Sequence, residues 1–379
     1  SRVYVVEAGR ADAPPVVLVH GLGRSGYQDW WETIDALEAD YRVVALDLPG
    51  FARSPVPEGA LSPARYARLL DWLLAELELR SVRLVGHSMG GAVALRHAAE
   101  YPGRIERVVL VDVAGILQRV AFLRAVASSK VAEAGLPGLV ERSLQRLLDW
   151  GGDMVEGLAM MPGVSLIDVL RSAEPAWDAL LADRPNANAA ISLLETDFSH
   201  ALARFDHPVT IVWGARDDVA PIRIGHLLHG RLARSRLAVI DDAGHAPMRT
   251  HTTAFLEHLR RGLSAPPVRD GPVLPAAGGG ELPDFTCRGR SGETISGVFD
   301  RIVIDDCPGM RLHAVRARSI RVSRASRVDL RHVRIDAGAT GPGLVVTGAE
   351  VTATDVHVRG EPAVRLDGAR LDLAGGRIA

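Results

Sequence analysis

The first 265 residues alternate short apolar runs with stretches of helical periodicity. The apolar runs are rich in leucine and β-branched residues, as in strands that are buried on both faces. Helical segments separate them, which is typical of a parallel sheet covered by helices on both sides. The pattern therefore predicts an α/β fold. The predicted strands are VVLV (16–19), RVVAL (42–46), VRLVG (82–86), RVVLVD (107–112), VTIVW (209–213) and RLAVI (236–240).

A long insertion interrupts this alternation between residues 112 and 209. It has helical periodicity and no strand pattern, as in LVERSLQRLLDW (139–150) and AAISLLETDFSHAL (189–202). We expect the insertion to form a helical cap, over about residues 115–205, above the carboxyl ends of the strands.

Downstream of residue 281 the apolar positions come in pairs two residues apart, such as Ile320/Val322. PGLVVTGAEVTATDVHVRG (342–360) aligns with PAVRLDGARLDLAGGRIA (362–379) at a shift of 20 residues. Three short faces per repeat, each with alternate side chains pointing inward, are what one coil of a parallel β-helix needs. We therefore predict an all-β, right-handed parallel β-helix-like domain. A small sandwich of short strands is the alternative.

A linker separates the two patterns at SAPPVRDGPVLPAAGGG (264–280), where proline and glycine crowd together and no periodicity remains. The two parts also differ in composition, because all six Trp and all five Tyr precede residue 214. We predict an α/β domain over 1–265, a Pro/Gly-rich linker over 266–280 and a β-helix-like repeat domain over 281–379.

Composition and charge exclude several classes of protein. The 379 residues are 47% hydrophobic and 24% charged, with a formal net charge of −2. Such a chain is globular and has no electrostatic footprint for nucleic acid or anionic lipid. No apolar run reaches the ~18 residues of a membrane span, and SRVYVVEAGR (1–10) lacks the pattern of a signal peptide. β-Helix modules nevertheless suit exported proteins, which favours a periplasmic or extracellular location.

The repeat domain holds the chain's two cysteines, Cys287 and Cys307, 20 residues apart. They could stack in adjacent coils, and whether they are bonded stays open. Neither belongs to a zinc-ligand pattern, so we expect no metal site and no cofactor. The last predicted coil ends at Ala379 without a polar cap, so we expect another subunit or further chain to cover its edge. Outward arginines are either solvated or bind an anionic polymer: Arg316, Arg318, Arg321, Arg324, Arg327, Arg331 and Arg334.

The most specific motif is Gly86-His87-Ser88-Met89-Gly90, between a predicted strand and the helical AVALRHAAEY (92–101). Nucleophilic attack needs a serine held at a tight strand-to-helix turn, and the crowding there requires glycine two residues to either side. The free N–H groups and the dipole at the start of the helix favour negative charge beside the serine. Ser88 is therefore the candidate nucleophile.

A serine hydroxyl needs a base that accepts its proton. His245, in DDAGHAPM, follows the last predicted strand, at the sheet edge where parallel strands collect functional groups. His87 adjoins Ser88, but we expect its side chain to point away and to pack. The histidines in helical stretches are expected at surface or capping positions: His97, His226, His229, His251 and His258.

The base needs a carboxylate that fixes its tautomer. Asp217 and Asp218, in WGARDDVAP (213–221), follow a predicted strand, and spacing alone does not choose between them. Asp112 ends another strand and is a further candidate, although a loop-capping role fits it better. The developing oxyanion needs donors as well. VVLVHGLGRSG (16–26) provides a strand followed by small residues whose N–H groups can face the site.

The motifs HGLG (20–23), GHSMGG (86–91), WGARD (213–217) and GHAPM (244–248), in that order, resemble the α/β-hydrolase superfamily. The likeness is greatest to its capped esterase and C–C hydrolase branches. The resemblance implies that the acid is Asp217 and the base His245, and that the N–H groups of Leu22 and Met89 are the oxyanion donors. Serine at the nucleophile position separates the chain from haloalkane dehalogenases and epoxide hydrolases, which resemble it but use Asp. The predicted repeat domain departs from the usual family architecture.

We therefore expect a serine hydrolase that cleaves a carboxylic ester, of the esterase or lipase kind, through an acyl-enzyme. A C–C bond hydrolase with the same triad is the alternative within this class. From another class, the chain could be a non-catalytic binding or assembly protein with a vestigial hydrolase domain. Apolar residues of the cap suggest a small hydrophobic substrate, although most would simply pack the cap: Leu158, Met160, Met161, Leu166, Ile167, Leu170, Trp177, Leu180 and Leu181.

Overall fold

The computed structural model describes residues 2–116, 184–265, 274–276, 282–324, 327–339 and 341–379. The chain divides into two compact units, and residues 226–233 and 270–379 belong to the second of them. The predicted helical segment 139–150 and the nine apolar cap residues named above lie outside the described residues.

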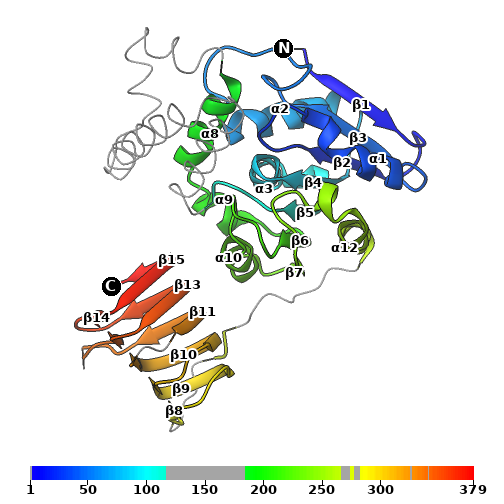
Figure 1. Ribbon diagram of the computed structural model, residues 1–379. Helices are drawn as coiled ribbons and strands as arrows, with labels where there is room; N and C mark the ends of the chain where they lie inside the picture. Colours follow the sequence, from blue (N-terminus) through cyan, green and yellow to red (C-terminus); the bar gives the residue numbers. More distant parts are fainter. Residues whose placement is uncertain (1, 117–183, 266–273, 277–281, 325–326, 340) are drawn as a thin grey trace, which may run out of the picture. The chain divides into compact units, whose positions relative to one another are not determined.

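A mostly parallel sheet of seven strands forms the centre of the first unit (Figure 1). Its order is β1-β3-β2-β4-β5-β6-β7, and only the β1–β3 pair is antiparallel. The predicted α/β fold is confirmed, and all six predicted strands are present, whereas β1 was not predicted. The strands are β1 (Tyr4–Ala8), β2 (Pro15–Val19), β3 (Arg42–Asp47), β4 (Val82–His87), β5 (Ile105–Val111), β6 (Val209–Gly214) and β7 (Ser235–Ile240).

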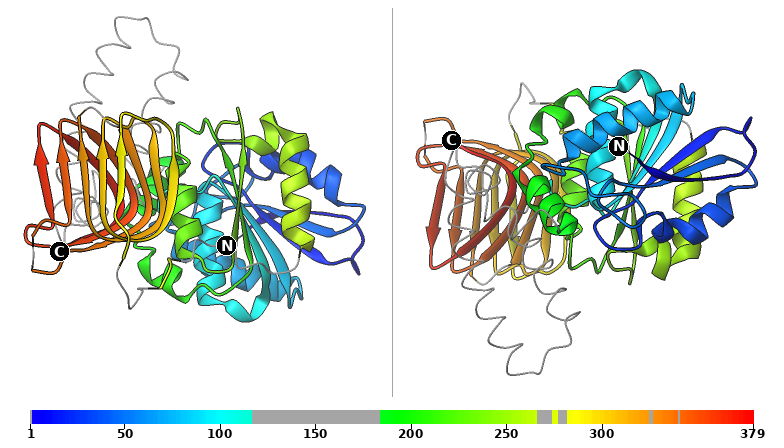
Figure 2. Two further views of the ribbon diagram at one scale, coloured as in Figure 1. Left: turned by 90° about the horizontal axis from the view of Figure 1, so that it is seen from below. Right: turned by 90° about the horizontal axis from the view of Figure 1, so that it is seen from above.

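Helices cover both faces of this sheet, with α2 and α3 on the side opposite α12 (Figure 2). Alternate strand side chains point to opposite faces, so Leu18 and Val85 pack with Phe255 and Leu259 of α12 in one apolar cluster. The helices here are α1 (Trp31–Leu37), α2 (Pro63–Glu76), α3 (Met89–Glu100), α10 (Arg223–Arg231), α11 (Pro247–Thr250) and α12 (Thr252–Ser264), with short turns η1 (Gly26–Trp30) and η2 (Pro102–Arg104).

The described end of the insertion is helical, as α8 (Pro185–Glu195) and α9 (Ser199–Arg204). Two asparagines of α8 bind loops of the sheet domain. Asn186 accepts a hydrogen bond from the N–H of Gly23 (2.9 Å), and Asn188 accepts one from the N–H of Leu61 (2.9 Å). Helix α8 is therefore attached to the loop that follows β2, beside the candidate site.

The second unit consists of parallel strands that stack one repeat upon the next (Figure 2). The shift of 20 found in the sequence is the register of its last strands, because Leu344 pairs with Val364 and Val351 with Leu371. An all-β region of parallel strands is thus present, while the right-handed β-helix stays a prediction. The strands are β8 (Phe285–Arg288), β9 (Thr294–Asp305), β10 (Met310–Ser323), β11 (Arg327–Asp336), β12 (Leu344–Thr347), β13 (Glu350–Arg359), β14 (Val364–Asp367) and β15 (Arg370–Ile378).

The inward positions of these strands form a continuous apolar core that includes Ile302, Ile320 and Leu344. Cys287 and Cys307 belong to this core and form a disulfide, with their Cα atoms 6.3 Å apart. The pairing that the sequence left open is therefore present, and it links β8 to the turn after β9.

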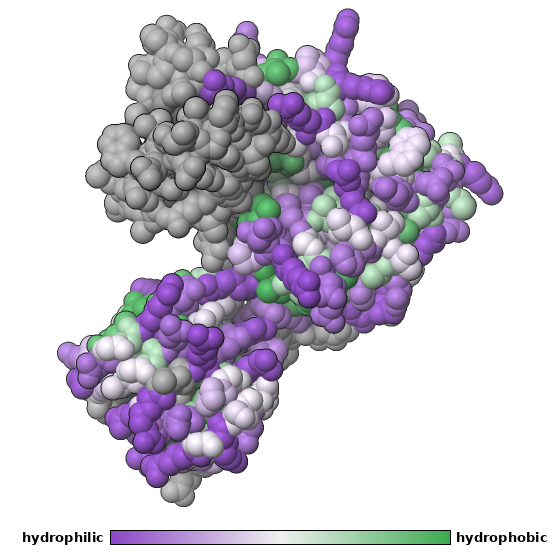
Figure 3. All heavy atoms as spheres, viewed as in Figure 1, coloured by the Kyte–Doolittle hydropathy of each residue, from purple (hydrophilic) through white to green (hydrophobic). Residues whose placement is uncertain are grey.

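The outer surface of these strands is mainly hydrophilic in the view of Figure 3. Large apolar side chains are nevertheless exposed on the last two strands: Leu366, Leu373 and Ile378 are 47%, 37% and 46% exposed. Leu366 pairs with Val346, which is fully buried one repeat earlier. Coverage of this edge by another subunit stays a prediction. Among the described helices, none has the length and apolar character that a membrane span requires.

Candidate active site

Ser88 occupies a sharp turn between β4 and α3, with φ 52° and ψ −118°. A side chain in this conformation costs about 1–3 kcal/mol and is maintained by its surroundings. Glycine is required two residues to either side, because a side chain would overlap neighbouring backbone atoms. A Cβ atom at Gly86 would lie 2.3 Å from the carbonyl oxygen of Gly90, and one at Gly90 would lie 2.2 Å from that of Val19. The turn thus presents the Ser88 hydroxyl at the start of a helix.

His245 lies in the loop after β7 and contacts two of the predicted site residues. Its Nε2 is 3.0 Å from Ser88 Oγ, and its Nδ1 is 2.8 Å from Asp217 Oδ2. The Nδ1–H donates to the carboxylate, which leaves Nε2 as the acceptor for the serine proton. Residues separated by 157 positions in the chain are therefore brought into hydrogen-bonding distance.

Asp217 follows β6, and its side chain is fully buried. Its second oxygen, Oδ1, accepts hydrogen bonds from the N–H groups of Val219 (2.9 Å) and Ala220 (2.8 Å). These bonds fix the carboxylate in the orientation that meets the His245 ring. The neighbouring Asp218 is exposed, so the two adjacent carboxylates differ in direction and environment.

The two predicted oxyanion donors lie in the segments that adjoin Ser88. Met89 is the first residue of α3, so its N–H has no carbonyl partner within that helix. Leu22 follows Gly21, where a Cβ atom would come within 2.8 Å of Ser88 Cβ. The loop after β2 therefore approaches the nucleophile closely enough that only glycine fits at position 21.

His87 has a role that the sequence did not indicate. It was expected to point away, but its ring centre is 4.9 Å from that of His245, and its Nε2–H donates to the His245 carbonyl oxygen (2.6 Å). Burial, and to a smaller extent the adjacent His245, lower the pKa of His87 to about 3. The neutral ring therefore holds the His245 loop in place. The sequence signal was only its adjacency to Ser88.

His20, the first residue of the HGLG motif, fixes the loop after β2. Its Nδ1–H donates to the carbonyl oxygen of Gly21 (2.7 Å), and its Nε2 accepts from the N–H of Leu48 (2.9 Å). Burial lowers its pKa, so the ring is neutral with one donor and one acceptor used. The HGLG motif contains His20, but no pattern in the sequence indicates this bridging role.

Two other predicted positions, His97 and Asp112, are buried. His97 was expected at a surface or capping position, and this was wrong, because the side chain is fully buried within α3. Asp112 is also fully buried. Its Oδ1 accepts the N–H of Gly214 (2.8 Å), which agrees with a capping role, but its Oδ2 has no hydrogen-bond partner among the described residues. Among the residues that the structure describes, no cluster of His, Cys, Asp and Glu could hold a metal ion.

Comparison with known proteins agrees with the fold of the first unit. The family model of the α/β hydrolase fold matches residues 14–152. The crystal structure of a hydrolase from Pseudomonas aeruginosa PA01 superposes with a TM-score of 0.52 at 26% identity, covering 69% of this chain and 94% of that one. The first unit of this chain has the α/β-hydrolase fold.

Curated relatives of the α/β-hydrolase domain differ in the reactions that their names describe. A pimeloyl-[acyl-carrier protein] methyl ester esterase from Neisseria meningitidis is 28% identical over 248 residues, which are 63% of this chain and 89% of that protein. A 2-hydroxy-6-oxononadienedioate/2-hydroxy-6-oxononatrienedioate hydrolase from Escherichia coli is 28% identical over 280 residues, 70% of this chain and 92% of that protein. The relatives thus support a hydrolase and leave open which bond it cleaves.

Proposed function

We propose that the protein is a serine hydrolase that cleaves a carboxylic ester through an acyl-enzyme. The observation that carries this proposal is the position of His245, with Nε2 3.0 Å from Ser88 Oγ and Nδ1 2.8 Å from Asp217 Oδ2. A hydroxyl, an imidazole and a buried carboxylate in this order form the arrangement that activates a serine.

In the first half of the reaction, Ser88 Oγ attacks the ester carbonyl carbon while His245 Nε2 accepts the hydroxyl proton. Asp217 keeps the proton of neutral His245 on Nδ1 and stabilises the imidazolium that forms. The N–H groups of Leu22 and Met89 donate to the tetrahedral oxyanion. His245 then returns its proton to the leaving alcohol, and the acyl group remains on Ser88.

In the second half, water takes the place of the alcohol. His245 removes a proton from this water, which attacks the acyl carbonyl. The bond from the acyl carbon to Ser88 Oγ then breaks, His245 returns the proton to Ser88 Oγ, and the carboxylic acid leaves. The neutral His87 ring maintains the position of the His245 loop throughout, because its burial disfavours protonation.

The second candidate is a C–C bond hydrolase with the same three residues. The Escherichia coli relative, named as a hydrolase of 2-hydroxy-6-oxo acids, favours it as directly as the methyl esterase favours an ester. We prefer the ester because acyl transfer needs only the groups described above. A non-catalytic role would leave the pairing of Ser88, His245 and Asp217 without a purpose.

The test is turnover of p-nitrophenyl esters of increasing acyl length, beside a vinylogous diketone acid, by the full chain and by Ser88→Ala. We expect ester hydrolysis, and a loss in kcat of about 10⁴-fold or more in the variant. Ser264→Ala, an exposed serine on α12, should retain full activity. Preferential turnover of the diketone acid would favour the second candidate. A fluorophosphonate that fails to label Ser88 would contradict both.

A further inference from the structure

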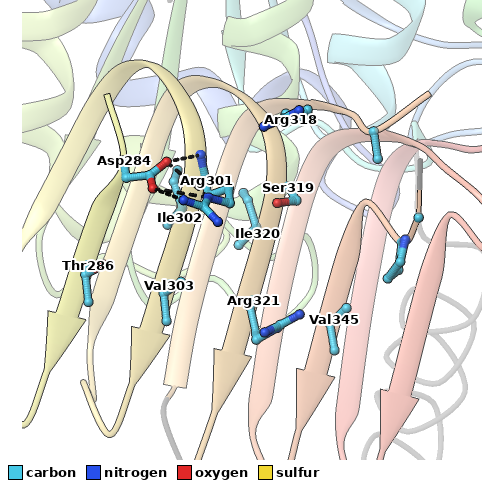
Figure 4. Close-up of a pocket in the computed structure, with 13 residues that line it drawn as sticks. Asp284, Thr286, Arg301, Ile302, Val303, Arg318, Ser319, Ile320, Arg321 and Val345 are labelled. Atoms are coloured by element: carbon cyan, nitrogen blue, oxygen red, sulfur yellow. Dashed lines mark hydrogen bonds and ion pairs between the residues drawn. The ribbon is translucent and has the colours of Figure 1, made fainter. Parts of the chain in front are cut away.

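The second unit has a cavity on its outer surface that the proposed reaction does not use (Figure 4). Its volume is about 560 Å³, and it crosses four strands, from β8 through β9 and β10 to β12. One wall comes from Ala337, Gly341 and Pro342, between β11 and β12. We call this cavity the arginine groove, after three of its lining residues, Arg301, Arg318 and Arg321.

Positive charge dominates the arginine groove, because its three arginines face a single lining carboxylate, Asp284. Arg301 binds Asp284 (Nη2 to Oδ2, 2.5 Å), as Figure 4 shows, and Arg318 binds Asp300 (Nη2 to Oδ2, 2.5 Å). Exposed ion pairs of this kind are weak, and both guanidinium groups have further N–H donors. They are therefore oriented but still able to bind an anion.

Arg321 differs from the other arginines of the groove. Its side chain is exposed and has neither an ion pair nor a hydrogen bond within the part of the chain that the structure describes. Arg316, Arg318, Arg324, Arg327, Arg331 and Arg334, the other outward arginines of the sequence, each have a carboxylate or carbonyl partner. The groove thus contains one guanidinium whose charge is not compensated.

The floor of the groove repeats along the stack of strands. Val303, Arg321 and Val345 lie side by side on β9, β10 and β12, because the strands pair in register (Figure 4). Arg365 continues the row on β14, opposite Val345. Neighbouring strands lie about 4.8 Å apart, so Arg321 and Arg365 are separated by about 10 Å, with a small apolar residue between them.

The residues that line the groove favour one class of polyanion over the others. The groove lining has no aromatic residue on which nucleic acid bases could stack. Its two large apolar side chains, Ile302 and Ile320, are buried, and no amphipathic helix belongs to the lining, so it has nothing to insert into a membrane. A ligand with repeated carboxylates, hydroxyl groups and small apolar surfaces fits better, because Thr286 and Ser319 add hydroxyls to the lining.

We propose that the arginine groove binds an acidic polysaccharide that runs along the stack of strands. Carboxylates of the sugar chain pair with Arg321 and with the remaining N–H donors of Arg301 and Arg318. The sugar rings lie on Val303 and Val345. This site is independent of Ser88, so it stands whichever bond the α/β-hydrolase domain cleaves.

The first test compares the binding of sodium alginate and of dextran to the full chain, by affinity electrophoresis and calorimetry. Alginate is a polymer of uronic acids, whereas dextran is neutral. We expect alginate to bind, and its affinity to fall as the salt concentration rises, while dextran does not bind. Equal binding of the two polymers, or binding of neither, would overturn the proposal.

The second test asks whether alginate binds in the arginine groove. Arg321→Gln should weaken alginate binding roughly tenfold, as expected for one lost charge-assisted contact. Arg370→Gln is the matched control, an exposed arginine on β15 that does not line the groove, and it should leave binding unchanged. Equal losses in both variants would show a diffuse charge effect and contradict the assignment. Single-stranded DNA that binds as tightly as alginate, with the same loss in Arg321→Gln, would overturn the choice of polysaccharide.

Discussion

Asp112 lies in an environment that disfavours the charged form of its carboxyl group. It is a fully buried carboxyl group at the end of β5, next to the strand that leads to Asp217. Burial, and then the negative charge of Asp217, raise its pKa well above the usual range. A neutral Asp112 would carry its proton on Oδ2, the oxygen without a partner among the described residues, while Oδ1 accepts from Gly214.

We expect Asp112→Asn to keep kcat within a few-fold of the unaltered protein, since the amide still provides one donor and one acceptor. Asp112→Leu, which removes both, should lower kcat about tenfold. Asp217→Asn should lower it about 10⁴-fold, because the tautomer of His245 is lost. Ester hydrolysis rates of the three purified variants check this. If Asp112→Asn had the larger loss and Asp217→Asn the smaller, Asp112 would be the acid.

The candidate site was predictable where its residues belong to local motifs. Ser88 and His245 follow from short patterns with a physical reason. Asp217 was separated from Asp218 only by the resemblance to a family, because two adjacent carboxylates have the same chemistry until the backbone directs them. The bond from His87 to the His245 carbonyl joins positions 158 residues apart, and no local pattern encodes such a contact.

At the scale of elements, most of the predicted strands are buried on both faces, such as β2 and β4. The edge strand β7 is half-buried and was predicted from its apolar run alone. Strand β1 is an antiparallel edge strand whose residues are mostly half-buried, so it has no long apolar run. In the second unit the alternation of inward and outward residues was sufficient. The register followed directly from Leu344 and Val346 and their partners one repeat later. The end of α8 that contacts Gly23 could not be predicted, since that contact depends on tertiary structure.

The disulfide of the second unit should stabilise its fold. Cys287 and Cys307 are separated by 20 residues, and closing a loop of this length restricts the unfolded chain by about 3 kcal/mol. We expect reduction to lower the unfolding free energy of this unit by a similar amount. Disulfides persist in oxidising compartments, which is consistent with the exported location that the sequence favours.

Hydrogen exchange of the β8 and β9 amides, with and without reductant, measures this effect, because the second unit has no tryptophan to report on it. The double variant Cys287→Ala/Cys307→Ala is the control, and its exchange should not respond to reductant. Protection that stays unchanged on reduction of the unaltered protein would show that the bond contributes no stability.

At the scale of the whole molecule, the α/β-hydrolase domain contains three buried histidines that resist protonation. Burial lowers the pKa of His20, of His87 to about 3 and of His97 to about 4. For His97 the positive charge of Arg104 and the nearby His207 act in the same direction, while the Asp71 carboxylate lies 4.0 Å from its Nε2. Each ring takes up a proton readily only after unfolding.

This domain should therefore lose stability in mild acid. Between pH 6.5, where an unfolded histidine titrates, and about pH 4, the unfolded state binds a proton at position 97 that the folded state does not. Stability from His97 is complete above this window and falls as the pH falls, by about 2 kcal/mol at pH 5.

Urea unfolding followed by tryptophan fluorescence reports on this domain alone, because all six Trp precede residue 214. The stability difference between His97→Leu and the unaltered protein should shift by that amount, in favour of the variant, from pH 7.5 to pH 5. His200→Leu, at an exposed position on α9, should show no such shift, since its ring is hydrated in both states. A pH-independent difference for His97→Leu would mean that the buried ring becomes charged without unfolding.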